Sequence, residues 1–286
     1  MVDIKDLDTG ERPTWCPGCG NYVLLSTLKA VISELELQPE NVVVVSGIGC
    51  GSKMPHFIKT YGFEGLHGRI LPVATGIKLA NKNLTVIAVG GDGDGYGIGG
   101  NHFIHAARRN IDITYIVQNN SVYGLTKGQY SPTSQKGFVS PTSPFGAIDE
   151  PVNPVSLAIS SGATYVARAW YMDANHLKEL IKNGVKHKGF ALIDVLQPCL
   201  TFNKINTIEW YTEKIYKLEE TEYKPNDKLI AFEKSQEFYP KIPIGLFYKE
   251  DGKPTYEDQL PQTEGKQPAE QKIENIDMNL FFKTLK

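Results

Sequence analysis

The sequence predicts a doubly wound α/β fold, in which helices cover both faces of a mostly parallel sheet. Five short runs rich in β-branched residues provide the strand signals, at residues 42–45, 85–89, 113–117, 164–167 and 190–195. Because these runs are continuously apolar rather than alternating, they are typical of strands buried on both faces. Longer amphipathic stretches separate them and predict helices at residues 22–37, 70–81, 101–110, 154–161 and 174–186. In such sheets ligands bind beyond the carboxyl ends of the strands, so the residues after each run are candidate site residues.

Composition and charge predict a soluble globular protein. Hydrophobic residues make up 41% of the 286 residues and charged residues 22%, which excludes global disorder. The 30 basic and 32 acidic residues give a net charge of −2, so the chain lacks the basic excess of a nucleic-acid binder. No apolar run is long enough to span a membrane, and the charged start lacks the apolar core of a secretory signal. Four cysteines are too few for a disulfide scaffold, and we expect a cytoplasmic protein.

The sequence pattern changes at about residue 200. Residues 1–200 carry the α/β alternation and predict the ligand-binding domain. Residues 201–286 lose that alternation and are expected to form an irregular C-terminal extension that packs on the domain or on a partner subunit. Within the first part, residues 126–153 are rich in Ser, Pro, Gly and Thr, which predicts a long loop. Loops of that length in compact domains are usually either functional or disordered.

Four cysteines form the first candidate site: Cys16, Cys19, Cys50 and Cys199. Cys16 and Cys19 form a CxxC pair before the first predicted helix, whereas Cys50 and Cys199 each follow a predicted strand. A zinc site would more often show a second CxxC or a His pair, and a thioredoxin-like dithiol would follow a βαβ strand. Unrelated buried thiols are a further alternative. A [4Fe–4S] cluster would use all four thiolates and is favoured, while the alternatives stay open.

The second candidate site is a glycine-rich segment at residues 90–100, directly after a predicted strand. Its match to the GxGxxG dinucleotide pattern is weak, because Asp92 and Asp94 would repel a diphosphate unless a cation lies between them. Mg²⁺ binds through one or two protein oxygens together with phosphate oxygens. Asn120 stands about 28 residues after Asp92, at the end of the next predicted strand. This spacing is that of thiamine diphosphate sites, and an ordinary tight turn is the alternative.

Four sequence segments carry a family resemblance. They are CPGCG at residues 16–20, GDGDGYGIGGNH at 91–102, NNSVYGLTKGQYSPTS at 119–134 and QPC at 197–199. Together they resemble the β subunit of 2-oxoacid:ferredoxin oxidoreductases, and the resemblance extends from residue 15 to about residue 248. In this family the β subunit has a sheet of the thiamine diphosphate-binding type and holds thiamine diphosphate, Mg²⁺ and one [4Fe–4S] cluster.

The resemblance implies a role for each matching position. It implies that the cluster ligands are Cys16, Cys19, Cys50 and Cys199, and that the Mg²⁺ ligands are Asp92, Asn120 and the Val122 carbonyl. It implies cofactor contacts for Ile48, Gly49, Cys50, Gly51, His67, Gly93, Asp94, Gly124 and Leu125. The basic residues nearest these loops, Lys53 and Lys127, are candidate catalytic residues. Lys127 stands in GLTKGQ, and similar loops in the family face the 2-oxoacid.

The implied activity is the oxidative decarboxylation of a 2-oxoacid, with 2-oxoglutarate and pyruvate as the expected substrates. Electrons would pass through the cluster to ferredoxin, and coenzyme A would take the acyl group. The motifs account only for the diphosphate half of a thiamine site, so an α subunit, or α and γ subunits, is expected to supply the rest. No nucleic acid or membrane is expected as a partner. The alternative is a cluster-carrying electron-transfer or assembly subunit that binds no substrate.

Overall fold

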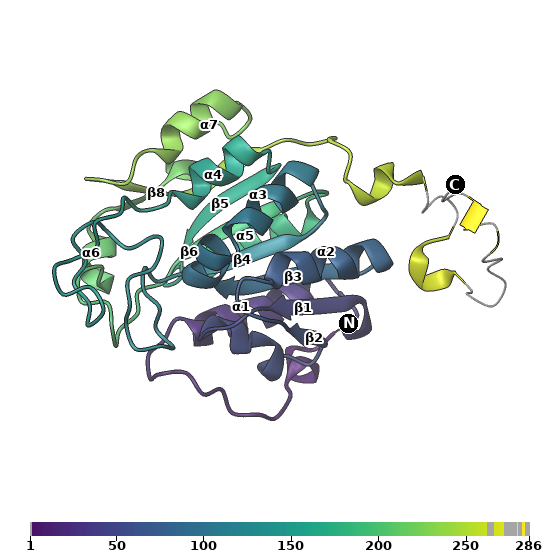
Figure 1. The fold of residues 1–286 in the computed structure, drawn as a ribbon, viewed down its shortest axis with the longest axis horizontal. Helices are drawn as coiled ribbons and strands as arrows, with labels where there is room; N and C mark the ends of the chain where they lie inside the picture. Colours follow the sequence, from purple (N-terminus) through teal and green to yellow (C-terminus); the bar gives the residue numbers. More distant parts are fainter. Residues whose placement is uncertain (1, 262–265, 272–278, 280–281, 284–286) are drawn as a thin grey trace.

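The computed structural model describes residues 2–261, 266–271, 279 and 282–283, which contain one eight-stranded sheet covered by helices on both faces (Figure 1). The strands are β1 (Val42–Ser46), β2 (Tyr61–Glu64), β3 (Thr85–Gly91), β4 (Thr114–Asn119), β5 (Tyr165–Trp170), β6 (Ala191–Leu196), β7 (Ile215–Lys217) and β8 (Ile242–Lys249). The α-helices are α1 (Asn21–Glu34), α2 (Ile70–Ala80), α3 (Gly100–Arg109), α4 (Pro154–Ser161), α5 (Ala174–Lys186), α6 (Ile208–Thr212) and α7 (Lys228–Ser235). The predicted doubly wound, mostly parallel α/β fold is confirmed.

The strand order is β2-β1-β3-β4-β6-β5-β8-β7, and only the β5–β8 pairing is antiparallel. From β1 the chain adds β2 on one side and β3 on the other, so the direction of the order reverses beside β1. The parallel register places Ser46 of β1 beside Val89 of β3, and Gly91 of β3 beside Gln118 of β4. The carboxyl ends of these three strands therefore meet at one edge of the sheet, where ligands bind in such folds.

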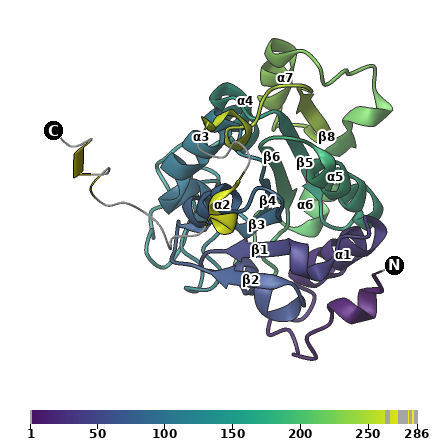
Figure 2. The same cartoon turned by 90° about the vertical axis from the view of Figure 1, so that its right-hand side faces the viewer.

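The two faces of the sheet have separate apolar cores. Residues of α1 and α5 pack on one face, and residues of α2, α3 and α4 pack on the other. Figure 2 shows these two groups of helices on opposite sides of the sheet. The central strands are buried along their whole length, as continuous apolar runs require. Among the described residues, no helix is both long and apolar enough to cross a membrane.

Local sequence signals start several of the helices. The side chains of Asn153 and Asp173 accept hydrogen bonds from backbone N–H groups in the first turns of α4 and α5. Pro154 occupies the first turn of α4, where its missing N–H costs nothing. All five predicted helices and all five predicted strands are present, with ends that agree to within a few residues.

Three strands were not predicted. β2 is exposed at every position and lies at one edge of the sheet, so no burial pattern marks it in the sequence. β7 has three residues, and β8 pairs with β5 across the opposite end of the sheet. The region after residue 200 thus contributes α6, α7, β7 and β8 to the same body as the first part. Residue 200 therefore marks a change in the sequence pattern, while the strands on both sides of it belong to one sheet.

The predicted long loop is present between β4 and α4. It contains isolated bridges, Tyr123 to Gln129 and Ser140 to Ser143, in place of helices or strands. Tyr123 N–H and Gln129 C=O are hydrogen-bonded at 2.9 Å, so the start of the loop turns back on itself. This turn lies beside the carboxyl end of β4, where the candidate site is built.

Candidate functional site

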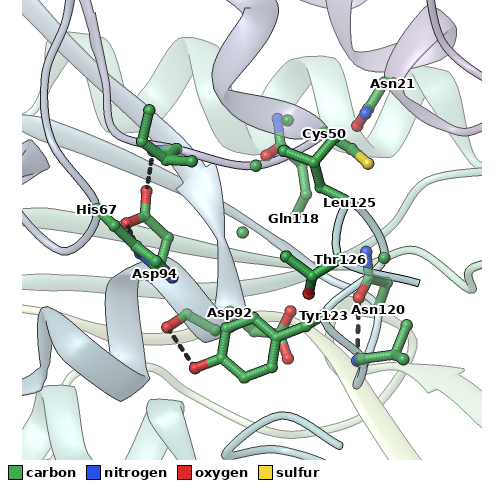
Figure 3. A pocket seen from close by; sticks show the side chains of 17 residues that line it. Asn21, Cys50, His67, Asp92, Asp94, Gln118, Asn120, Tyr123, Leu125 and Thr126 are labelled. Atoms are coloured by element: carbon green, nitrogen blue, oxygen red, sulfur yellow. Dashed lines mark hydrogen bonds and ion pairs between the residues drawn. The ribbon is translucent and has the colours of Figure 1, made fainter. Parts of the chain in front are cut away.

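Segments that follow β1, β3 and β4 line one cavity of about 70 Å³ at the switch point of the sheet (Figure 3). Every residue for which the sequence implied a cofactor or Mg²⁺ contact lies on its wall: Ile48, Gly49, Cys50, Gly51, His67, Asp92, Gly93, Asp94, Asn120, Val122, Gly124 and Leu125. We call this the cofactor cavity. Residues that are far apart in the sequence meet here because the three parallel strands end together.

Asp92 lies between β3 and the π-helical turn η4 (Gly93–Ile98), and it is only 1% exposed. Its Oδ2 accepts hydrogen bonds from the hydroxyls of Ser131 and Thr133, the latter at 2.6 Å. Burial raises the pKa of the Asp92 carboxyl to about 6, and these hydrogen bonds oppose the rise. The long loop thus holds the carboxylate in place. Burying this charge lowers the free energy of unfolding, and a bound cation would offset that loss.

Asn120 and Val122 follow β4 and face the same cavity as Asp92. Val122 N–H donates to Asn120 Oδ1 at 3.0 Å, which fixes the turn. Tyr123 OH donates to Gly93 C=O at 3.0 Å and connects this turn to the one after β3. A carboxylate, an amide and a backbone carbonyl are the oxygen ligands that suit Mg²⁺. The donor set therefore fits Mg²⁺ with a diphosphate.

Asp94 points away from Asp92 and organises a different part of the wall (Figure 3). Its carboxylate accepts hydrogen bonds from Ile48 N–H at 3.0 Å and from Gly68 N–H, and it contacts His67 Nδ1 at 2.6 Å. Ser52 Oγ lies 3.4 Å from the same carboxylate. The predicted contact residues Ile48 and His67 are therefore positioned by Asp94.

The four cysteines line a second cavity, of about 290 Å³, which we call the cysteine cavity. A Cβ placed on Gly124 would lie 3.6 Å from Cys199 Sγ and 3.8 Å from Cys50 Sγ, so these two sulfurs come close together. Burial raises the pKa of Cys19 to about 11, and the neighbouring thiols Cys50, Cys199 and Cys16 add to the rise. Burial also raises the pKa of Cys50. The four cysteines, far apart in the sequence, thus line one cavity.

The two cavities share part of their walls. Asn21, Cys50, Asn120, Gly124 and Leu125 line both of them. Trp15 Nε1–H donates to Cys50 C=O at 2.6 Å and fixes the turn that separates them. Among the residues that the structure describes, no three His, Cys, Asp or Glu side chains converge tightly enough to hold a single metal ion.

Lys53 and Lys127 lie on the cysteine cavity and do not line the cofactor cavity. Lys53 Nζ donates to Thr14 Oγ1 at 3.2 Å. Lys127 is exposed, and its backbone has a φ of +77°, a left-handed conformation that few residues other than Gly adopt. Backbone strain of this kind is often found at ligand-binding loops.

Sequence reasoning missed several residues of the site. Ser131 and Thr133, which hold Asp92, lie in the segment at residues 119–134 that carries the resemblance, but no role was predicted for them. Gln118 and Asn21 also line the cofactor cavity, and no motif marked either of them. The position of Gln118, at the carboxyl end of a predicted strand, was the one signal that could have found it.

Comparisons with known proteins agree with this geometry. Residues 45–195 match the family described as thiamine pyrophosphate enzyme, C-terminal TPP binding domain. Residues 199–265 match the family that describes the C-terminal part of the pyruvate ferredoxin oxidoreductase beta chain.

Individual relatives carry related names. The chain is 51% identical over 276 residues to a 2-oxoacid:ferredoxin oxidoreductase subunit beta of Sulfolobus, covering 91% of this chain and 90% of that one. It is 51% identical over 199 residues to the 2-oxoglutarate oxidoreductase subunit KorB of Mycobacterium tuberculosis, covering 70% of this chain and 53% of the relative. A solved structure of 2-oxoglutarate:ferredoxin oxidoreductase from Magnetococcus marinus, with 2-oxoglutarate, coenzyme A and succinyl-CoA bound, matches with a TM-score of 0.90 and 37% identity. That match covers 100% of this chain and 96% of the other.

Fold, site and matches together define a subunit of the thiamine pyrophosphate enzymes. Within that class, the chain belongs to the β subunits of the 2-oxoacid:ferredoxin oxidoreductases.

Replacing Asp92 by Asn is expected to stabilise the cofactor-free protein at neutral pH. The folded-state pKa of about 6 lies above the ordinary 3.8, so the folded state binds the proton more tightly than the unfolded chain does. The free energy of unfolding therefore falls as pH rises from about 4 to about 6, and Asp92→Asn should recover about 1–3 kcal/mol near pH 7.5.

Urea unfolding of both proteins near pH 7.5 and near pH 4 would measure this effect, which should shrink at the lower pH. Asp149→Asn, a change at an exposed carboxylate of the long loop between β4 and α4, is the control and should shift stability by no more than about 0.5 kcal/mol. A loss of stability in Asp92→Asn near pH 7.5 would contradict the prediction.

Proposed function

We propose that this chain is the β subunit of a coenzyme A-dependent 2-oxoacid:ferredoxin oxidoreductase that holds thiamine diphosphate, Mg²⁺ and one [4Fe–4S] cluster. The observation that carries the proposal is the contact between the two cavities. Cys50 and Gly124 line both the cofactor cavity and the cysteine cavity. A cofactor in the first cavity would lie next to a cluster in the second, which suits an enzyme that passes electrons from one to the other.

The proposed Mg²⁺ ligands are Asp92, Asn120 and the Val122 carbonyl, which lie in one cavity. Two anionic carboxylates, Asp92 and Asp94, line that cavity, and a diphosphate there needs a cation to neutralise the repulsion. The Ser131 and Thr133 hydroxyls hold one oxygen of Asp92 in position. These residues support a cofactor whose diphosphate is anchored through the metal.

The proposed cluster ligands are Cys16, Cys19, Cys50 and Cys199. The four cysteines line one cavity of about 290 Å³, and four thiolates are the ligand set of a four-iron cluster. Burial favours the neutral thiol at Cys19, so the thiolate needs the positive charge of bound metal.

Thiamine diphosphate and the cluster supply the chemistry of decarboxylation and one-electron transfer, and the protein supplies binding and orientation. Lys127 is exposed and lines the cysteine cavity close in sequence to Gly124 and Leu125, which also line the cofactor cavity. From this shared wall its ammonium is proposed to pair with the distal carboxylate of a 2-oxoglutarate that reacts at the thiamine. Lys53, on the same cavity, is held by Thr14 and adds a second positive charge for an anionic substrate. The proposal also includes pyruvate as a second substrate, coenzyme A as the acceptor of the acyl group and ferredoxin as the acceptor of the electrons. The proposed location is the cytoplasm.

An α subunit, or α and γ subunits, is proposed to supply the other half of the cofactor site. The cofactor cavity, about 70 Å³, is far smaller than the roughly 300–1,000 Å³ of typical cofactor sites. None of the described residues on its wall is a glutamate, the residue expected to activate the aminopyrimidine ring. Ile48 and Leu125 on the wall are 38% and 48% exposed, and Leu66, next to His67, is 75% exposed. Such an apolar rim is typical of a surface that a partner covers.

The proposed function is tested by assaying the chain alone and with its α subunit for 2-oxoacid- and coenzyme A-dependent reduction of ferredoxin. We expect no activity from the chain alone and full activity from the complex. A complex that retains iron but binds no thiamine diphosphate would favour the electron-transfer alternative. Full oxidation of a 2-oxoacid by the chain alone would contradict the half-site argument.

Lys127→Ala is expected to lower kcat/KM for 2-oxoglutarate by about tenfold or more and to affect pyruvate less. A hydrogen bond to a charged group contributes roughly 1.5–3 kcal/mol, and only 2-oxoglutarate has the distal carboxylate. The control is Lys136→Ala, a change in the same loop at a lysine that is paired with Glu150. It should leave kcat/KM for both substrates unchanged. Equal losses on both acids would place Lys127 at the shared keto-acid group or in loop structure.

Anaerobically purified chain is expected to contain about four irons and to show a broad visible absorption band. Cys199→Ala should lose most of this iron, because three thiolates remain around the cavity. Iron and zinc analysis of both proteins measures the effect. Stoichiometric zinc without iron in the unaltered chain would contradict the cluster.

A further inference from the structure

Gln118 is the next-to-last residue of β4, and its side chain has no hydrogen-bond partner within the part of the chain that the structure describes. The residue is 1% exposed, and both amide atoms, Oε1 and Nε2, are buried and unpaired. The large majority of buried side-chain amides are hydrogen-bonded, so an amide with neither atom paired needs a specific explanation.

The amide lies against the turn that follows β1. A Cβ on Gly51 would come within 1.7 Å of Gln118 Oε1, so only a glycine leaves room for the side chain there. Gln118 and Gly51 both line the cofactor cavity, and in Figure 3 the Gln118 side chain extends towards the turn that carries Cys50. The unpaired amide is therefore part of the wall of this cavity.

The neighbouring residue on the same face of β4 is apolar. Ile116, two residues earlier and on the same side of the strand, belongs to the core formed with α1 and α5. An aliphatic side chain at position 118 would continue that core without the cost of burying an unpaired amide. A residue that breaks the local pattern in this way, at a cost to the folded state, is typical of a functional site.

We propose that Gln118 contacts the cofactor, with its side-chain amide hydrogen-bonding to bound thiamine diphosphate. The inference rests on the proposed function and adds a contact that no sequence motif marks. Asp92 and Asp94 give the cavity two acceptor-only side chains, whereas the Gln118 Nε2 group is an uncommitted donor. This free donor is suited to a phosphate oxygen or to a ring acceptor of the cofactor.

The test compares the affinity of Mg²⁺–thiamine diphosphate for the complex of this chain with its α subunit, unaltered and with Gln118→Leu or Gln118→Met. Calorimetric titration of cofactor-free complex gives the Kd, and thermal unfolding of the same samples gives the melting temperature. We expect a Kd about tenfold weaker in both variants, since a hydrogen bond to a charged ligand is lost. We also expect an equal or higher melting temperature without cofactor, because an unpaired buried amide has been removed.

Gln267→Leu is the matched control. Gln267 is buried and lines neither the cofactor cavity nor the cysteine cavity. Its Oε1 accepts from Lys82 N–H at 2.9 Å and its Nε2 donates to Glu270 Oε1 at 2.9 Å, so its loss should lower the melting temperature and leave the Kd within about twofold. The two glutamines are thus expected to respond in opposite ways.

The outcomes separate this inference from the proposed function. Unaltered complex that binds no thiamine diphosphate would overturn both. Normal binding by the unaltered complex, lost in Asp92→Asn but unchanged in the Gln118 variants, would overturn the contact alone. If Gln118→Leu lowers the melting temperature, Gln118→Met becomes the test of the contact, because the unbranched Met side chain follows the same path as Gln. An unchanged Kd in Gln118→Met overturns the proposal.

Discussion

The buried carboxylate of Asp94 is the interaction on which the geometry of the site depends. It accepts hydrogen bonds from the turn after β1, through Ile48 N–H, and from the turn before α2, through Gly68 N–H, while it also contacts His67. Asp94 itself belongs to η4, after β3, so one side chain connects three segments that are distant in sequence. A charged group is tolerated at this depth only when donors surround it, and each donor here comes from a segment that must be in place. The hydrogen bonds of Asp94 therefore join three parts of the wall of the cofactor cavity.

Two buried polar residues lower the free energy of unfolding at the edge of the sheet where ligands are proposed to bind. Asp92 is buried with its pKa raised to about 6, and Gln118 is buried with both amide atoms unpaired among the described residues. Both positions come after buried apolar stretches of β3 and β4. The long loop between β4 and α4 offsets part of this cost, because Ser131 and Thr133 donate hydrogen bonds to Asp92. A loop of this length is thus explained by the carboxylate that it holds.

The two cavities share a wall and are proposed to hold different groups, thiamine diphosphate in the cofactor cavity and the cluster in the cysteine cavity. Cys50 belongs to both, with its thiol among the other cysteines and its backbone in the turn that Asp94 fixes. Trp15 holds the same turn from the cysteine side through Cys50 C=O. A change in the turn would therefore reach both sites at once. The exposed apolar side chains Ile48, Leu66 and Leu125 near the cofactor cavity are typical of a surface that a partner covers.

The sequence by itself determined the central strands, the flanking helices and the spacing of Asp92 and Asn120, because continuous apolar runs and strand-end positions are local patterns. It also determined which four thiols were present, since the chain has no others. The tertiary structure decided the rest. The edge strand β2 is exposed and carries no burial pattern, and β8 joins the sheet through pairing with a strand far earlier in the chain. Ser131, Thr133 and Gln118 became site residues only through contacts with distant segments, such as Gln118 with Gly51. Local patterns record burial and turn preference, whereas the partner of a polar side chain is set by the packing of segments that the sequence separates.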